Sequence, residues 1–187
     1  MGGDRRIGVF SSAPQGSGGM WRHHTPHRGM IDMPKIHGPL EDSARKTTGE
    51  VLQASVVDLI DLSLLAKQCH WNVIGRSFRS VHLQLDELVD VARKHTDVLA
   101  ERAVAIGVNP DGRSTKVAGD TRNAQPDPGY LQDDKVIAVI TDALAGMVSR
   151  FRERIATTEE SDEVSQDELI AAAQDLEQQH WMFEAMR

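Results

Sequence analysis

The residues best suited to chemistry are two pairs of polar side chains, each pair spaced four residues apart. His82 and Asp86 form one pair, and Asp97 and Glu101 form the other. On a helix, residues four apart lie on one face, so each pair can reach a single ion. Imidazole and carboxylate ligands suit iron(II), zinc or manganese, and open coordination positions suit the redox chemistry of iron. Each pair is only half a site, and a polar stripe taken alone is more often a solvated helix face.

The two pairs are too far apart to share one ion within a chain. The histidine of one pair and the aspartate of the other are separated by 15 residues, which is roughly 22 Å along a helix. If two copies of this helix cross antiparallel about a two-fold axis near residues 91 and 92, His82 faces Glu101 and Asp86 faces Asp97. We therefore predict two identical sites per dimer, each combining a histidine end from one chain with a carboxylate end from its partner.

His70 is a further candidate ligand, because a helix hairpin would bring it near His82. A histidine at a helix end is more often a cap or a half-buried polar group than a ligand, and both interpretations stay open. His95 lies on an apolar stripe and is predicted to be a hydrogen-bonded core residue. Cys69 is predicted to serve packing. The single Glu-x-x-His motif, at 177–180, does not meet the requirement of a di-iron bundle for two such motifs in one chain.

Four segments with apolar residues at helical spacing predict an all-α fold. A capping-box pattern at 47–50 opens the first, which runs to Gly75, and a second capping box at 165–168 opens the fourth. The second runs from about Phe78 to Gly107, and the third spans about 136–155. The apolar stripe of the second segment consists of Val81, Leu85, Leu88, Ala92, Leu99, Ala103 and Ile106.

The stretch from Gly107 to Gly129 contains too many glycines and prolines for a long helix and too many residues for a tight turn. A short helix around Lys116 to Arg122 fits within it. Such a connection suits a bundle whose second and third helices run parallel and need a crossover along its length. We expect two hairpins joined by that crossover.

Composition divides the chain of 187 residues into an N-terminal arm, residues 1–45, and a helical domain, residues 46–187. The arm is rich in glycine, proline and histidine, has no apolar period, and is expected to be flexible. Residues 1–40 carry about +3, which leaves about −10 of the net −7 for the remainder. The basic residues of the arm, which are the candidate DNA contacts, are Arg5, Arg6, Arg22, Arg28 and Lys35.

Several classes of protein are disfavoured by composition. Cys69 is the only cysteine, so neither a disulfide framework nor a thiolate metal cage is expected, and a reducing cytoplasm fits best. Glycine, serine and proline follow the first arginines where a secretory signal would have an apolar run. No apolar stretch approaches the roughly 20 residues of a membrane helix.

The motifs together resemble the Dps family, the DNA-binding proteins from starved cells, from about residue 47 to 183. The matching residues combine specific types with specific spacing: Leu59-Ile60-Asp61-Leu62-Ser63-Leu64, Lys67-Gln68, His70-Trp71-Asn72-Val73, Gly75, Phe78, Val81-His82, Asp86, Asp97 and Ala100-Glu101-Arg102-Ala103.

The resemblance implies a ferritin-like four-helix bundle that assembles into a hollow shell of twelve chains. It implies a ferroxidase site at each two-fold interface, with His70 and His82 from one chain, Asp97 and Glu101 from its partner, and Asp86 close by. Two irons per site are expected, with zinc an alternative resting occupant. The implied reaction is iron(II) oxidation, preferably by hydrogen peroxide, with iron(III) mineral stored inside.

The same resemblance implies roles outside the ligand set. Trp71 and Trp181 correspond to tryptophans near the site that accept oxidising equivalents, although packing between helices is an equal alternative. Asp162, Glu163 and Asp167 correspond to the acidic lining of three-fold pores, while acidic residues at a helix start need no such explanation.

DNA binding would depend on the arm, because an acidic body repels DNA. Twelve weak arms would act together and bind DNA without sequence preference. Packing of the arm on a neighbouring subunit and metal binding by its histidines are equally good alternatives. The leading interpretation is an iron-oxidising store in the cytoplasm. The alternatives are a nucleoid-associated, DNA-compacting protein whose metal site is secondary, and a plain helical scaffold with a solvated acidic face.

Overall fold

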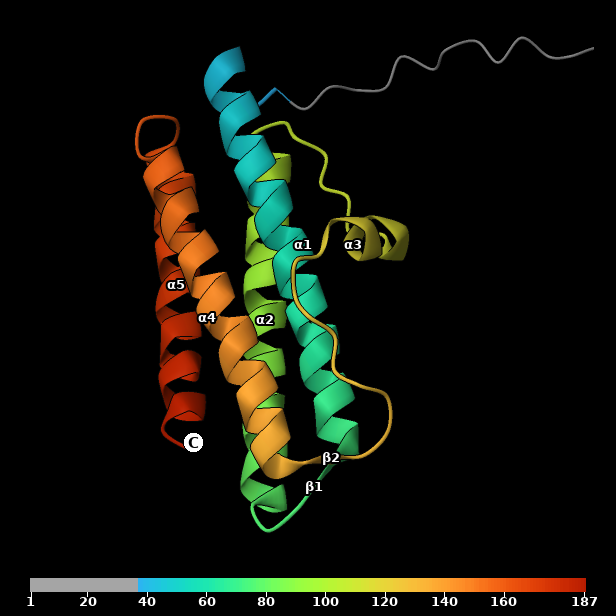
Figure 1. The fold of residues 1–187 in the computed structure, drawn as a ribbon. Coiled ribbons are helices and arrows are strands. Elements are labelled where there is room, and N and C mark those ends of the chain that lie inside the picture. The colour runs from blue at the N-terminus through green and yellow to red at the C-terminus, as the bar shows by residue number, and fades with distance from the viewer. Residues whose placement is uncertain (1–36) are drawn as a thin grey trace, which may run out of the picture. The chain divides into compact units, whose positions relative to one another are not determined.

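The computed structural model describes residues 37–187, and Figure 1 shows four long helices, of which the second and third are joined by a long crossover that contains a short helix. The elements, in chain order, are α1 (Asp42–Asn72), β1 (Val73–Ile74), α2 (Phe78–Ala105), α3 (Ser114–Asp120), β2 (Leu131–Gln132), α4 (Asp133–Thr158) and α5 (Glu163–Glu184).

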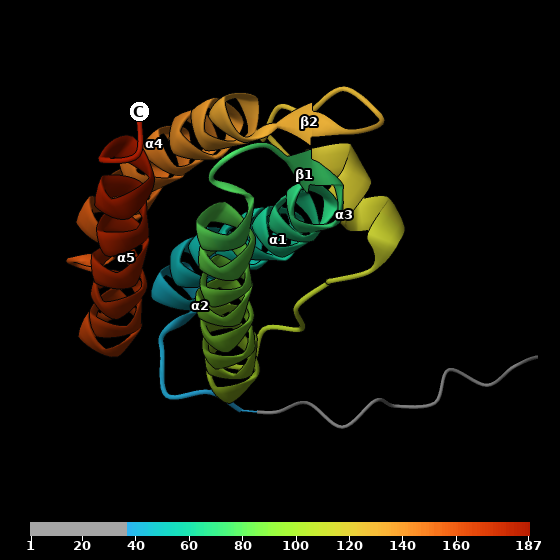
Figure 2. The same cartoon turned by 90° about the horizontal axis from the view of Figure 1, so that it is seen from below.

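The four long helices form two hairpins that share one core. α1 packs along α2 and α4 along α5, while α1 also contacts α4 and α2 contacts α5; Figure 2 shows this arrangement along the helices. Each helix contributes fully buried apolar side chains, for example Leu59, Leu88, Phe151 and Phe183. The predicted apolar stripe of α2 is buried along its whole length. The all-α ferritin-like bundle expected from the sequence is therefore confirmed.

The crossover between α2 and α4 is held at its far end by a short parallel strand pair. Val73 pairs with Leu131 and Ile74 with Gln132, so α2 and α4 start at the same end of the bundle and run parallel, as predicted. The turn after β1 requires glycine at position 75, because φ is 134° there and a Cβ would collide with the Asp133 carboxylate. That carboxylate accepts a hydrogen bond from the Ser77 N–H at 2.5 Å.

The crossover is also anchored in its middle by a buried carboxylate of α1. Asp61 accepts hydrogen bonds from the Thr121 hydroxyl at 2.6 Å and from the Asn123 side-chain amide at 2.9 Å. These bonds draw the chain onto α1 directly after α3. The short helix therefore ends at Asp120 and begins at Ser114, two residues earlier at each end than predicted.

The predicted start of the first helix is wrong by about one turn. α1 begins at Asp42, so the boundary placed between residues 45 and 46 falls inside a helix. Thr47, the cap of the supposed capping box, lies inside this helix, and the neighbouring Thr48 is fully buried with its hydroxyl 3.0 Å from that of Ser161. Residues 1–36 of the arm lie outside the described residues.

The predicted cap of the last helix is also wrong. α5 begins at Glu163, and its N-cap is Asp162 instead of Ser165. The Asp162 carboxylate accepts a hydrogen bond from the Ser165 backbone N–H at 3.1 Å, which satisfies one of the free donors of the first turn.

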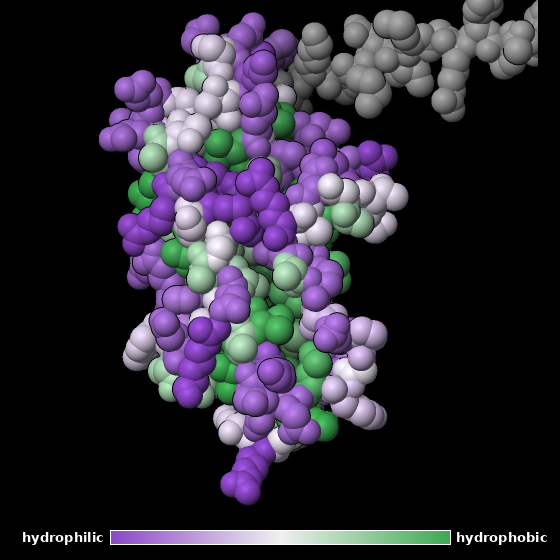
Figure 3. All heavy atoms as spheres, in the orientation of Figure 1, coloured by the Kyte–Doolittle hydropathy of each residue, from purple (hydrophilic) through white to green (hydrophobic). Residues whose placement is uncertain are grey.

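Most of the surface of this region is polar, and apolar side chains reach it in places. Figure 3 shows hydrophilic residues over the upper part of the face seen in Figure 1 and a group of hydrophobic residues over the lower part. Within residues 37–187, no helix combines the length and the apolar character needed to cross a membrane.

Candidate metal centre

The turn between α1 and α2 brings two histidines into contact. His70 lies in the last turn of α1 and His82 near the start of α2, and their rings stack with centroids 3.6 Å apart and planes inclined by 23°. The buried Val73 and Val81 fix the two helix ends on the core beside them. His70 is itself buried and His82 is half-buried. The hairpin predicted to bring these residues together does so.

Each histidine is oriented by the backbone of the other. Nδ1 of His70 lies 3.0 Å from the carbonyl oxygen of His82, and Nδ1 of His82 lies 3.0 Å from the carbonyl oxygen of His70. A carbonyl oxygen only accepts, so both Nδ1 atoms donate, and in the neutral form of each imidazole Nε2 is the atom with a free lone pair. A histidine that ligates a metal commonly uses its other nitrogen in this way. The pair is thus set up as two nitrogen ligands.

Asp86 adds a carboxylate to the pair. Single ligand atoms of His70, His82 and Asp86 all lie within 4.8 Å of one another. Lys67 hydrogen-bonds the carboxylate, which lowers the pKa of Asp86, and the two histidines lower it further. Asp86 is therefore anionic at neutral pH and half-exposed, and a metal ion would compete with Lys67 for it. Two nitrogens and one carboxylate fit a divalent transition metal but leave its coordination incomplete.

Asp97 and Glu101 lie on the same helix but do not join this cluster. Both are exposed, and neither makes an ion pair within residues 37–187. Glu101 is followed by Arg102, whose Nη2 donates to Asp162 at 2.7 Å, so the neighbouring arginine is already occupied. The separation along α2 matches the expectation that one chain cannot complete a site alone. Whether a partner completes it stays a prediction.

The tryptophans are exposed in the isolated chain. Trp71 follows His70 and is 67% exposed, and Trp181 on α5 is 64% exposed. Neither side chain is packed between the helices of its own chain. The alternative prediction, that the tryptophans pack between helices, is therefore wrong within one chain. Both remain available to a neighbouring chain or to reactants.

The three predicted pore residues differ in their surroundings. Asp162 is buried, caps α5 and pairs with Arg102, whereas Glu163 and Asp167 are exposed on the first turns of α5. Burial opposes ionisation of Asp162, but hydrogen bonds from Arg102 and Ser165 outweigh it and hold its pKa below the usual range. The carboxylate of Asp162 is therefore committed within the chain, while the other two point to solvent.

The residues set aside in the sequence have structural partners. His95 is buried, and its Nε2 lies 2.7 Å from Asp175, as expected for a core histidine. Glu177 pairs with Arg152 at 2.6 Å, so it is not held beside His180 as a ligand pair would be. Cys69 is fully buried, and burial raises the pKa of its thiol to about 11.

The sequence assigned no role to two sets of charged residues, one beside the metal centre and one away from it. Lys67 lies one helical turn before His70, and that spacing was the available signal for its contact with the cluster. Arg150 and Arg154, an i,i+4 pair on α4, both bind Asp58 of α1. The candidate DNA contacts Arg5, Arg6, Arg22, Arg28 and Lys35 lie outside the described residues.

The chain is similar to known proteins over most of its length. Residues 49–187 match the Ferritin-like domain family. The DNA protection during starvation protein of Mycolicibacterium smegmatis is 32% identical over 149 residues, which is 78% of this chain and 80% of the relative. The protein of the same name from Agrobacterium fabrum is 32% identical over 153 residues, 81% of this chain and 94% of the relative.

Solved structures agree with the sequence relatives. A tetragonal form of Mycobacterium smegmatis Dps superposes with a TM-score of 0.77 at 29% identity, covering 82% of this chain and 93% of that one. Dps from Microbacterium arborescens, in a form described as high iron, gives a TM-score of 0.76 at 28% identity, covering 80% and 97%. Both likenesses extend over nearly the whole of the solved chains.

Proposed function

Because this chain belongs to the Dps family of ferritin-like proteins, we propose that it oxidises iron(II) at sites shared between two copies of itself. The iron(III) product is stored inside a hollow shell of twelve chains, and DNA is protected from oxidative damage as a result. The solved relative in a high iron form supports this direction.

The observation that carries the proposal is the histidine cluster. Two imidazoles are held by backbone carbonyls through Nδ1, and their ligand atoms gather with the anionic carboxylate of Asp86, at the end of a helix whose other end exposes Asp97 and Glu101. A chain built only as a scaffold has no reason to stack two half-buried histidines and orient both through backbone carbonyls. An antiparallel copy of α2 would supply the missing carboxylates.

Each group in the shared site has a distinct task. The nitrogens of His70 and His82 bind iron(II), and the partner's carboxylates would neutralise its charge and favour iron(III) over iron(II). Two iron(II) ions each give one electron to hydrogen peroxide, which takes up two protons and leaves as two waters. Using both electrons at one site avoids the hydroxyl radical that one-electron reduction would release.

Iron would reach the interior through openings lined by Glu163 and Asp167. Both carboxylates are exposed at the start of α5, where they can attract cations. Asp162 would support such an opening indirectly, by fixing the start of the helix. Trp71 and Trp181, exposed as they are, would take up oxidising equivalents that escape the irons.

The arm offers a second candidate function, nucleoid binding in the cytoplasm. Residues 1–40 are basic while the remainder is acidic, so DNA affinity would belong to the arm and fall steeply with salt. Removing residues 1–36 and measuring DNA retardation at several salt concentrations tests this. If retardation survives the deletion, the arm is not the DNA-binding element.

The ferroxidase proposal is tested by adding sub-stoichiometric hydrogen peroxide to iron(II) and protein without oxygen. We expect about two irons oxidised per peroxide in the wild type, and a loss of at least a hundredfold in rate in a His82→Ala, Glu101→Ala variant. Glu87→Ala is the matched control, because Glu87 is an exposed acidic residue of the same helix. Equal rates in the wild type and the double variant, both shown to assemble, would reject the proposal.

A further inference from the structure

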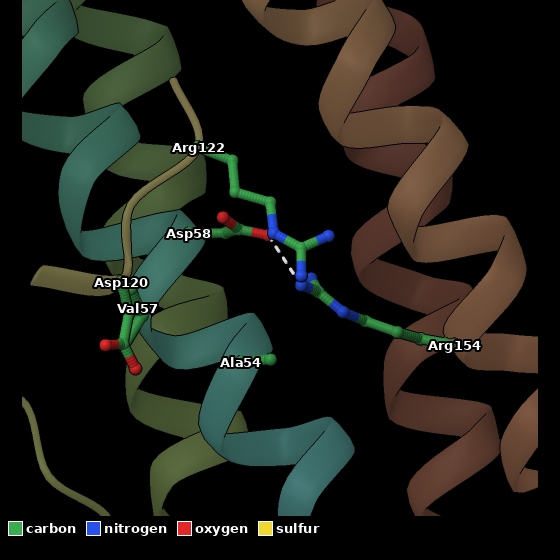
Figure 4. A pocket seen from close by; sticks show the side chains of 6 residues that line it. All are labelled: Ala54, Val57, Asp58, Asp120, Arg122 and Arg154. Carbon is green, nitrogen blue, oxygen red and sulfur yellow. Dashed lines mark hydrogen bonds and ion pairs between the residues drawn. The ribbon is translucent and has the colours of Figure 1, made fainter. Parts of the chain in front are cut away.

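A second cluster of charged side chains surrounds a pocket between α1, α4 and the chain after α3. The pocket has a volume of about 290 Å³. Figure 4 shows its walls, with Arg122 entering from the crossover and Arg154 from α4. The lining residues, none of which belongs to the metal centre, are Ala54, Val57, Asp58, Asp120, Arg122 and Arg154.

Several guanidinium groups gather at this pocket around a single buried carboxylate. Asp58 is 2% exposed, and one oxygen of its carboxylate accepts hydrogen bonds from Arg150 at 2.9 Å and from Arg154 at 2.6 Å. Arg122 brings a third guanidinium beside them. Asp120 is engaged by Lys116 at 2.6 Å. One buried carboxylate therefore pairs with two arginines, and the guanidinium of Arg122 makes no ion pair within residues 37–187.

Arg154 also has a donor with nothing to bind. Its Nη1 is buried and has no hydrogen-bond partner within residues 37–187. Burial lowers the pKa of Arg154, Asp58 opposes that effect, and the like charges of Arg150 and Arg122 add to it. Buried donors are nearly always paired, and a charged donor left unpaired is costly. The pocket thus has both the charge and the free N–H of an anion site.

We propose that this pocket binds a small oxyanion of the phosphate class. A guanidinium presents two parallel N–H groups that match two oxygens of such an anion. Nη1 of Arg154 supplies a buried donor, and Arg122 closes over the bound anion from the solvent side. The anion would pair with the guanidinium of Arg122 and tie α1, α4 and the crossover together.

The surroundings of the pocket select for a small ligand. A hollow of about 240 Å³ shares Arg122 and Arg154 with the pocket, and the exposed Glu50 and Glu153 line it. These carboxylates repel a long polyanion such as DNA but leave room for a single phosphate group. A carboxylate of a neighbouring copy has similar chemistry, so the experiment must separate a free anion from a subunit contact.

The experiment measures binding of inorganic phosphate to the assembled, iron-free full chain by equilibrium dialysis at constant ionic strength. We expect one phosphate per chain, and at least a tenfold weaker affinity in Arg122→Gln, because one charge-assisted contact is lost. Arg122 is exposed, so this variant should fold. Arg152→Gln is the control, because Arg152 is an exposed arginine of α4 that pairs with Glu177 outside the pocket. It should bind phosphate as the wild type does.

Particle mass, measured by light scattering, distinguishes the two sources of anion. Retained assembly together with weaker phosphate binding in Arg122→Gln supports the proposal. Wild type that binds no phosphate overturns it, and disassembly of Arg122→Gln would then assign the pocket to a neighbouring chain's carboxylate. Equal phosphate affinity in Arg122→Gln and wild type also overturns it.

Discussion

The two ends of α2 carry the proposed ligands of one kind of site but differ in how the chain holds them. At the N-terminal end, His82 is locked to His70 through backbone carbonyls and Asp86 is held by Lys67. At the C-terminal end, Asp97 and Glu101 are exposed and make no ion pair within residues 37–187. The side chains at the N-terminal end are held in place when the chain folds. Those at the C-terminal end have no ion-pairing partner among the described residues.

The difference between the two ends follows from the charges of their side chains. Neutral imidazoles can be held close together without repulsion, so the nitrogen half of a site can be fixed in advance. Two carboxylates four residues apart repel each other when buried without a cation. In the proposed shared site, leaving them in water until a partner and a metal ion arrive would avoid that repulsion and would couple metal binding to assembly.

Mixed assembly gives the largest test of this comparison. Co-assembling His82→Ala chains with Glu101→Ala chains should restore about a quarter of the wild-type sites when chains pair at random, because half the two-fold dimers are mixed and each has one intact site. Each variant alone should be at least a hundredfold slower in iron(II) oxidation with peroxide. If the mixture stays as inactive as its components, the two ends of α2 do not meet across an interface.

Stability should separate neighbouring residues at the C-terminal end of α2. Arg102→Gln should lower the free energy of unfolding by about 2–4 kcal/mol, because it leaves the buried Asp162 carboxylate without its cation. Glu101→Gln should change it by less than about 0.5 kcal/mol, as for other surface substitutions. Guanidinium chloride unfolding of the iron-free protein measures both. Similar losses in the two variants would mean that Glu101 is not free in the folded chain.

Acid should narrow the gap between the wild type and Arg102→Gln. The pKa of Asp162 is lowered in the folded chain, so its contribution is complete above the unfolded value of about 4 and is lost as pH falls through the folded value. The variant lacks Arg102, so it should lose less stability over the same acid range. Unfolding free energies measured from pH 6 to pH 2.5 test this, and parallel curves would contradict it.

The smallest expected effect is a change in the pKa of Asp86, at the N-terminal end of α2. Lys67→Gln should raise the pKa of Asp86 toward its ordinary value, because the hydrogen bond from Lys67 is the main cause of its lowering. Titration of ¹³C-labelled aspartate carboxyls, with Asp86→Asn to assign the signal, measures the change. Lys94→Gln is the control, because Lys94 contacts Asp175 instead. A Lys67→Gln titration curve identical to that of the wild type would show that Lys67 does not hold this carboxylate in solution.

Much of the fold was predictable because local signals and packing agree. The apolar stripe of α2 is buried along its length, and Gly107 ends that run with φ of 81°. The predicted starts of the first and last helices were wrong because local capping signals and the contacts of the folded chain disagree there. Thr47 and Ser165 fit a capping motif, but Thr47 lies inside α1, and the Ser165 side chain donates to the Asp162 carboxylate that caps α5.

The candidate site was predictable to the extent that it lies on one helix. The spacing of His82 and Asp86 fixes a shared face, and the hairpin adds His70. The backbone carbonyls that set the imidazole tautomers depend on the turn geometry, which spacing does not contain. The arginine pocket was missed because Asp58 and Arg154 lie 96 residues apart and meet only through packing of α1 on α4.

The burial of Cys69 protects its thiol from oxidation. The thiol adjoins His70 in sequence, yet it is fully buried with a pKa raised to about 11. Peroxide attacks thiolates, and almost none forms at neutral pH. If peroxide is consumed at the proposed site, this neighbouring thiol would therefore escape oxidation to sulfenic acid and disulfide cross-linking between subunits.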